Sequence, residues 1–387
     1  MRTLLIKVSL ILISLTLALV FTEVALRLMH YGEGFGVNLK SLMEYDPVLG
    51  WRHKRSSSSE LIAKEFHTTL QFDARGVRGF DPPYSKPPNV LRILVLGDSF
   101  VEGYAVQVQD RFTEVLQATL GPGFEVMALG VSGYSTDQEL LLLEQEGWKY
   151  QPDLVVLAFY YNDVWGNGSP IVSGGIALTA HKPVFVMDAG GNLILTNVPV
   201  PYPRPLLHER FKVYNLIRTV VRGSPWLDSL AVRARLAEAR PSDHRPMGGV
   251  GSPDEFEVYQ KTETKKVKRE WTITQALLHR MKQEADERGV HFVVFYVPSR
   301  VEVSEEEWTK LRIPPDYDPG TVAGRLVAIC KAEGAAYVVP SDRFREAAQH
   351  DRLYYRFDAH WTPAGNRLAA GILAEYAQSL AGATAKQ

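Results

Sequence analysis

Continuous apolar runs that alternate with helical segments constrain this sequence more than any other feature. Three runs after residue 90 are typical of strands covered on both faces, and helical patterns separate them. The same alternation returns after residue 270. Strands that alternate with helices form a parallel sheet with right-handed crossovers. The pattern predicts an α/β fold with strands at residues 92–96, 124–129, 153–161, 290–299 and 335–340.

The first 30 residues are typical of a membrane-spanning segment. Arg2 and Lys7 precede an uncharged run that ends at Glu23. If Lys7 and Glu23 lie at the two interfaces, residues 4–26 form a helix of about 34 Å, which spans a bilayer. We expect an uncleaved, single-pass anchor in the inner membrane, with the basic residues cytoplasmic and the rest periplasmic. A signal that is cleaved, giving a secreted protein, is the alternative.

These patterns divide the chain into three parts. Residues 1–30 are the anchor or signal, and residues 31–89 form a lead-in segment with little clear periodicity. Residues 90–382 form the main α/β domain, with an insertion at about 165–271.

Charge and cysteine content exclude several classes of function. The 43 basic and 44 acidic residues leave a net charge of −1, which argues against nucleic acid as a main partner. One cysteine, Cys330, leaves no internal disulfide, and no Cys/His cluster has zinc-ligand spacing. We therefore expect neither a metal nor an organic cofactor, and the sequence does not define the oligomeric state.

Polar residues follow the first three strands, at the sheet edge where open parallel sheets bind ligands. Gly97-Asp98-Ser99 follows the first strand, Gly133 lies in the turn after the second, and Asn162 follows the third. A serine that attacks an ester creates an oxyanion, which needs hydrogen-bond donors already in place. The backbone N–H groups of Ser99 and Gly133 and the side-chain amide of Asn162 are three candidate donors.

A serine nucleophile also needs a base, and His360 is the best candidate among the ten histidines. Asp358 precedes it by two residues and can orient the imidazole. Thr362 and Pro363 are typical of an N-cap and a first helical position. We therefore expect His360 at the rigid start of a helix.

These motifs resemble the SGNH hydrolases, also called the GDSL esterase/lipase superfamily. The four blocks VLGDSF, GVSGYST, YYND and DAHWTPAG stand in the family's usual order over about residues 90–380. Upstream, LGWR and FDARGVRGF resemble segments of a membrane-tethered bacterial subgroup. The resemblance implies a flavodoxin-like three-layer α/β/α sandwich.

The resemblance also implies the role of each site residue. Ser99 is the nucleophile, His360 the general base and acid, and Asp358 the orienting carboxylate. Ser99, Gly133 and Asn162 form the oxyanion hole. The chain departs from the family in having Asp-x-His where many members have Asp-x-x-His, and in having Ala128 where the second block usually has Asn. Asp-x-His-Trp is similar to SGNH-like proteins that O-acetylate alginate, although in those proteins the pair lies upstream of the serine.

Three functions are compatible with these residues. The first is a serine esterase that removes O-acyl groups, especially O-acetyl, from a cell-envelope carbohydrate. The second is a polysaccharide O-acetyltransferase that uses the same Ser/His/Asp site, and the third is a non-catalytic carbohydrate-binding scaffold. Four aromatic residues near the site are weak candidates for sugar stacking, and packing in the core or at the rim is the interpretation we favour: Tyr134, Tyr161, Trp165 and Trp361.

Overall fold

The computed structural model describes residues 2–29, 39–172, 180–202, 211–233, 256–310 and 315–384. The chain divides into two compact units. Met1–Gly36 and Pro203–Arg245 form the first, which we call the anchor unit. Val37–Tyr202 and Pro246–Gln387 form the second, which we call the core unit. The segment expected to be a single insertion therefore contributes to both units.

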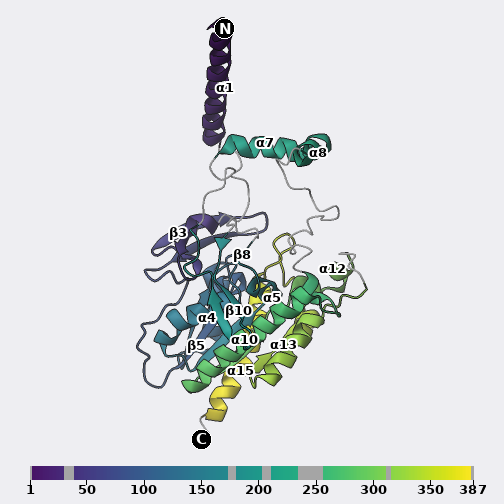
Figure 1. The fold of residues 1–387 in the computed structure, drawn as a ribbon. Helices are drawn as coiled ribbons and strands as arrows, with labels where there is room; N and C mark the ends of the chain where they lie inside the picture. The colour runs from purple at the N-terminus through teal and green to yellow at the C-terminus, as the bar shows by residue number, and fades with distance from the viewer. Residues whose placement is uncertain are drawn as a thin grey trace. The chain divides into compact units, whose positions relative to one another are not determined.

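The anchor unit consists of three described helices (Figure 1). They are α1 (Arg2–Leu28), α7 (Lys212–Gly223) and α8 (Pro225–Arg233). Within Ile6–Leu28 of α1, a window of 18 residues has a mean hydropathy of 2.2, and none of that window is buried. Helix α1 is thus long and apolar enough to fit a membrane anchor or a signal sequence.

A five-stranded parallel sheet forms the centre of the core unit. Its strands are β5 (Leu91–Gly97), β6 (Phe124–Gly130), β7 (Leu154–Phe159), β12 (His291–Tyr296) and β13 (Ala336–Val338). The spatial order is β13-β12-β7-β5-β6, and every neighbouring pair is parallel. This is the flavodoxin-like order. The chain adds β6 on one side of β5 and then β7, β12 and β13 on the other side. The structure confirms the α/β fold and all five expected strands.

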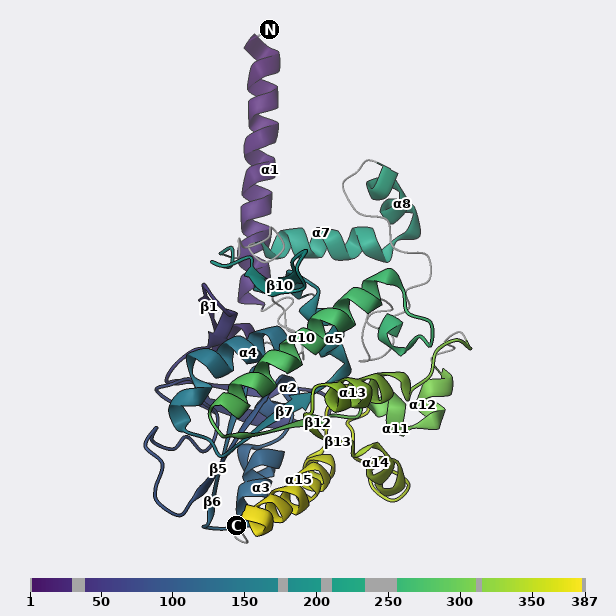
Figure 2. The ribbon, with the colours of Figure 1, turned by 60° about the horizontal axis from the view of Figure 1, so that its bottom comes forward.

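Helices cover both faces of this sheet (Figure 2). Successive residues of each strand point to opposite sides, so the apolar strands present two apolar faces that the helices bury. One buried cluster contains Leu94, Leu96 and Val155 beside residues of α4 and α10. The other contains Ile93, Val95 and Val156 beside residues of α3 and α15. The main helices of these layers are α3 (Phe112–Leu120), α4 (Thr136–Gln145), α10 (Lys265–Glu287), α13 (Thr321–Ala332), α14 (Ser341–Ala347) and α15 (Pro363–Thr384).

Shorter elements complete the core unit. The helices are η1 (Leu39–Leu42), α2 (Ser99–Glu102), η2 (Val108–Asp110), η3 (Gly147–Tyr150), α5 (Tyr161–Asn167), η4 (Glu257–Tyr259), α11 (Arg300–Val303) and α12 (Glu305–Lys310). The antiparallel pairs are β1 (Met43–Asp46) with β2 (Gly50–His53), β3 (Ser57–Ile62) with β4 (His67–Phe72), β8 (Ile171–Val172) with β9 (Ala180–His181), and β10 (Val184–Met187) with β11 (Leu193–Thr196).

The lead-in segment is more ordered than its sequence pattern indicates. It forms two hairpins, and Trp51, Leu70 and Phe72 are buried in the same cluster as one face of the central sheet. Short strands with few apolar residues give a weak periodic signal, which explains why the hairpins were not predicted. The lead-in segment is therefore part of the core.

Candidate active site

Ser99 stands at the carboxyl end of β5, as the first residue of α2. The Asp98 carboxylate before it accepts a hydrogen bond from the Phe100 N–H at 2.9 Å and so caps this short helix. Helix α2 lies directly against the end of β6, since a Cβ at Gly130 would come within 2.3 Å of the Glu102 backbone nitrogen. We call residues 97–106 the serine turn. The absence of a side chain at Gly130 thus allows the serine turn to pack directly against the end of the sheet.

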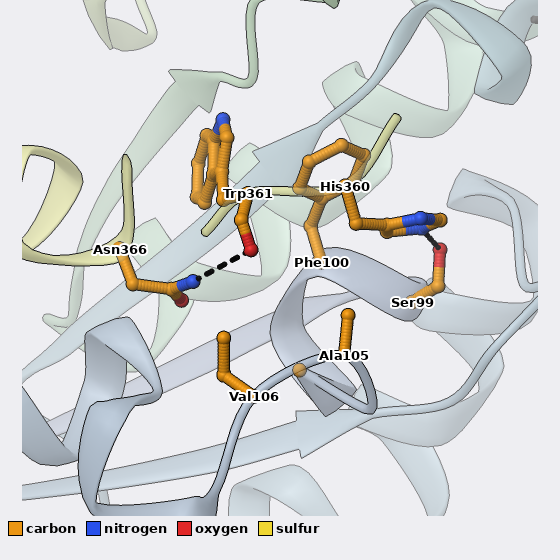
Figure 3. A pocket seen from close by; sticks show the side chains of 8 residues that line it. Ser99, Phe100, Ala105, Val106, His360, Trp361 and Asn366 are labelled. Atoms are coloured by element: carbon orange, nitrogen blue, oxygen red, sulfur yellow. Dashed lines mark hydrogen bonds between the residues drawn. The ribbon is translucent and has the colours of Figure 1, made fainter. Parts of the chain in front are cut away.

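His360 lies three residues before the first residue of α15, and its side chain contacts Ser99. Its Nε2 lies 2.8 Å from the Ser99 hydroxyl (Figure 3). Its Nδ1 lies 2.6 Å from Oδ1 of Asp358. Thr362 precedes α15, and its hydroxyl accepts a hydrogen bond from the Gly365 N–H at 3.4 Å. The structure therefore brings together the three residues that the sequence indicates as nucleophile, base and orienting acid.

The left-handed backbone conformation of Ala359 allows the side chains of Asp358 and His360 to meet across the short Asp-x-His spacing. Ala359 has φ = +71°, a conformation that costs an alanine roughly 1–2 kcal/mol. It is buried between Asp358 and His360, whose side chains meet on the same side of the chain. Strain at such a position is typical of functional sites.

Asp358 and His360 shift each other's pKa: the pKa of the Asp358 carboxyl is lowered, and the pKa of the His360 imidazole is raised. Burial alone would lower the pKa of His360, but the charge and hydrogen bond of Asp358 outweigh burial and raise it. Burial would likewise raise the pKa of Asp358, but the interactions with His360 and with Tyr104 lower it. With the Nδ1 proton donated to Asp358, Nε2 of the neutral imidazole is free to accept the Ser99 proton.

Tyr104 is a fourth member of the site that sequence reasoning missed. Its hydroxyl donates to Asp358 at 3.2 and 3.1 Å and lies 2.9 Å from Nδ1 of His360. Burial and the charge of Asp358 raise the pKa of Tyr104 well above its usual value, so it stays a neutral donor. Its place five residues after Ser99 does not distinguish it from a core tyrosine, so sequence alone gave no signal.

The three expected oxyanion donors follow neighbouring strands, as predicted. Gly133 lies in a turn closed by a hydrogen bond from the Tyr134 N–H to the Val131 carbonyl, and its φ of +81° favours glycine. Asn162 is the second residue of α5, directly after β7. Its side-chain oxygen is buried and has no hydrogen-bond partner among the described residues. Their joint role as an oxyanion hole stays a prediction.

The aromatic candidates for sugar stacking are mostly inside the protein. Tyr134, Tyr161 and Trp361 are 1%, 3% and 2% exposed, and Trp361 packs edge-on against Phe100. Buried rings offer no face to a sugar, so the structure places these three in the core, contrary to the stacking expectation. Trp165 alone of the four is partly exposed.

A small cavity lies beside the reacting groups (Figure 3). Its volume is about 10 Å³, and Phe100, Ala105, Val106, Trp361 and Asn366 line it together with Ser99 and His360. That volume corresponds to about one water molecule. An acyl group attached to Ser99 therefore has to occupy the open side of the site.

Side chains of the lead-in segment donate hydrogen bonds to backbone carbonyls of the serine turn. Arg78 is buried, and its guanidinium donates to the carbonyls of Glu102, Gly103 and Val106 at 2.7–2.8 Å. The Thr68 hydroxyl donates to the Tyr104 carbonyl at 2.7 Å. Burial lowers the pKa of Arg78 to about 9, so the side chain stays charged at neutral pH.

A buried contact between His53 and Glu102 extends this support to the turn that contains Gly133. Nε2 of His53 lies 3.2 Å from Oε2 of Glu102, and the same carboxylate oxygen accepts the Ser132 N–H at 2.6 Å. Burial alone would raise the pKa of Glu102, but His53 and Ser132 lower it. One carboxylate thus links the serine helix to the residue before Gly133.

Within the described residues, no three His, Cys, Asp or Glu side chains are arranged to hold a metal ion. The chemistry that the site does support is acyl transfer through a serine.

Part of the chain matches a known family model. Residues 256–387 match the family model described as "SGNH hydrolase-like domain, acetyltransferase AlgX", which confirms the resemblance over the segment that carries Asp358 and His360. A search of the curated proteins found no significant match.

Solved structures similar to this chain include three hydrolases. An acetyl xylan esterase is 11% identical, with 73% of this chain and 98% of that one covered and a TM-score of 0.39. The lipase/acylhydrolase from Enterococcus faecalis is 12% identical, with 74% and 95% covered and a TM-score of 0.38. A member of the lipolytic G-D-S-L family from Veillonella parvula is 12% identical, with 74% and 97% covered and a TM-score of 0.38. TM-scores below 0.5 do not bear on the activity of this chain.

Proposed function

We propose that this protein is a serine esterase that removes O-acetyl groups from a cell-envelope carbohydrate through an acyl-enzyme on Ser99. The observation that carries the proposal is the continuous row from Ser99 through His360 to Asp358, at 2.8 and 2.6 Å. Such a row activates a serine hydroxyl, which is otherwise a weak nucleophile.

The reaction has two halves. In the first, Ser99 Oγ bonds to the acyl carbon while its proton passes to Nε2 of His360. The oxyanion accepts hydrogen bonds from the N–H groups of Ser99 and Gly133 and from the Asn162 amide. His360 then gives the proton to the leaving sugar oxygen, and the ester bond to that oxygen breaks. In the second half, His360 takes a proton from water, the hydroxide attacks the acyl carbon, and Ser99 leaves with that proton.

An O-acetyltransferase is the second candidate, and the family match favours it. The matching model is described as an acetyltransferase, and it covers the segment with the Asp-x-His-Trp motif. A sugar hydroxyl replaces water in the second half-reaction, with no other change to the residues involved. Whether water or sugar attacks depends on what the open side of the site admits.

The membrane helix supports the proposed location. Helix α1 fits an inner-membrane anchor, and on the positive-inside rule Arg2 and Lys7 stay in the cytoplasm. The core unit then lies outside the inner membrane, where envelope carbohydrates are found. Cleavage of α1 as a signal would give a secreted enzyme with the same site.

The test measures both products in one reaction. The protein is incubated with an acetyl ester donor and a sugar oligomer, and free acetate and acetylated sugar are quantified, with Ser99→Ala as control. Acetate that depends on Ser99, without acetylated sugar, supports the esterase. Acetylated sugar that depends on Ser99 supports the transferase. If a folded Ser99→Ala protein gives both products at the wild-type rate, the proposal is wrong.

A further inference from the structure

Helices α7 and α8 present apolar side chains that no described residue covers. Phe211, directly before α7, is 42% exposed, and Tyr214, Ile217 and Val220 within α7 are 40%, 51% and 56% exposed. On α8, Trp226 is 70% exposed and Leu230 is 51% exposed. Large apolar groups exposed together mark an interaction surface, and a single scattered one does not. We call these six residues the apolar face of the helix pair.

The sequence of α7 is strongly amphipathic. Positions 213, 214, 216, 217, 220 and 221 are all apolar or aromatic and fall on one side of an α-helix. Positions 212, 215, 218, 219 and 222 are all polar or basic and fall on the other side. From Lys212 to Arg233 the chain has four basic residues and one acidic residue. Amphipathic helices with a basic polar face and aromatic residues on the apolar face bind in the interface of a bilayer.

The contact between α1 and α7 sets the depth of this helix pair. Oε2 of Glu23 accepts the Val213 N–H at 2.8 Å, which fixes the first turn of α7 to α1. Glu23 lies five residues before the end of the apolar stretch Ile6–Leu28, or about 8 Å along the helix axis. Interfacial helices lie about 5–10 Å into the boundary between headgroups and acyl chains.

The direction of α7 agrees with this depth. Figure 1 shows α7 running across the C-terminal end of α1, so a bilayer crossed by α1 has α7 along its surface. The stretch Ile6–Leu28 has 23 residues, about 34 Å, and so spans the hydrocarbon core of about 30 Å. Tyrosine and tryptophan, which the helix pair exposes as Tyr214 and Trp226, are enriched at this level of a membrane.

We propose that α7 and α8 form a second membrane contact, in which the apolar face lies among the acyl chains of an anionic phospholipid bilayer beside α1. Three observations carry the proposal: the uncovered apolar face, the basic excess of the helix pair, and attachment at the end of the span. The contact is independent of the chemistry at Ser99. It holds the anchor unit to the bilayer at two elements, where α1 alone would provide one.

The test uses the full chain in vesicles of phosphatidylcholine and phosphatidylglycerol whose acyl chains carry bromine, which quenches tryptophan on contact. Trp226 is the exposed one of the seven tryptophans, because Trp51, Trp271 and Trp361 are buried and the other three are partly buried. The matched control is Trp226→Phe. We expect brominated lipid to quench a component of the emission in the wild type, and this component to be lost in the control.

A charge on the apolar face should remove the same component. Ile217→Asp places a carboxylate among acyl chains, whereas Ile194→Asp places one at a similarly exposed isoleucine of β11 in the core unit. We expect Ile217→Asp to abolish quenching by brominated lipid and Ile194→Asp to leave it unchanged. Quenching of Trp226 by aqueous iodide alone would show that the face meets water. Protection from both quenchers would show that protein covers it, and either result would overturn the proposal.

Discussion

Ser99 and His360 meet at one hydrogen bond, but different parts of the chain hold them. On the histidine side the supports are local: the His360 carbonyl accepts from the Tyr355 N–H, and the Leu353 carbonyl accepts from the Thr362 N–H. On the serine side the supports come from the lead-in segment, through buried side chains such as Arg78. The backbone next to His360 is thus held by its neighbours in sequence, with Tyr104 and Glu65 as the distant contacts on this side. The serine side depends on residues at least 20 positions away.

From this difference we infer that the lead-in segment supports the proposed catalytic site, although none of its residues reacts. Breaking the histidine side should remove chemistry and leave the fold intact. Substituting a lead-in residue that supports Ser99 should lower both the stability of the fold and the activity. Four substitutions and one matched control separate these outcomes.

Asp358→Asn should give the largest effect. The amide keeps the shape of the side chain but loses the charge that raises the pKa of His360, and it stabilises the wrong imidazole tautomer. We expect kcat to fall about 10³–10⁴-fold with the free energy of unfolding nearly unchanged. Steady-state kinetics and a thermal melt on the same preparation measure both. A variant that keeps more than a tenth of the activity would remove Asp358 from the proposed site.

Arg78→Met should give the next largest effect and should combine two losses. It removes the guanidinium donor from three buried carbonyls. The Gly103 carbonyl keeps the Val106 N–H as a donor, while the carbonyls of Glu102 and Val106 lose theirs, at about 1–3 kcal/mol for each group left unsatisfied. The serine turn is then free to shift, and a displacement of about 1 Å can cost about 10²-fold in rate. Since Arg78 touches no substrate, the loss should appear in kcat with KM unchanged.

The matched control for Arg78→Met is Glu65→Ala, on the same segment. Glu65 accepts the backbone N–H groups of Arg356 and Phe357 at 2.9 and 2.5 Å, near His360, but these contacts are exposed to solvent. Water can replace an exposed acceptor, so we expect less than about 1 kcal/mol of lost stability and little lost activity. Equal effects in the two variants would contradict the contrast between the two sides.

Tyr104→Phe should have a smaller effect that depends on pH. The neutral base form of His360 is needed to take the Ser99 proton, so activity should rise with pH through the raised pKa of His360. The Tyr104 hydroxyl donates to Asp358 and partly neutralises the carboxylate charge. Without this donor, the full charge of Asp358 acts on His360 and should raise the pKa of His360 further. We expect the acid limb of kcat/KM to move up by as much as about one pH unit. A uniform loss at every pH would indicate a purely structural tyrosine.

The same contrast explains what the sequence could predict. The blocks around Ser99, Asn162 and His360 are local patterns, and strand ends of a parallel sheet converge, so these residues and the sheet were predictable. Arg78 and Tyr104 act through contacts over about 25 and 250 positions, which no local pattern encodes. The burial of Trp361 was also not predictable, because a ring beside a catalytic histidine looks the same in sequence whether it packs inward or faces the substrate.

Ala359→Gly should give the smallest effect, and it tests how far the histidine side depends on strain. Glycine adopts φ = +71° without the steric cost of an alanine, roughly 1–2 kcal/mol, but it loses about 0.5–1 kcal/mol more conformational freedom on folding. We therefore expect a gain of at most about 1.5 kcal/mol in the free energy of unfolding, measured by denaturant titration. If the neighbouring hydrogen bonds alone align Asp358 with His360, kcat should stay within about twofold of the wild type. A large loss of kcat in a stabilised protein would instead show that the rigid alanine itself maintains the alignment, and the histidine side would then be less robust than its local contacts indicate.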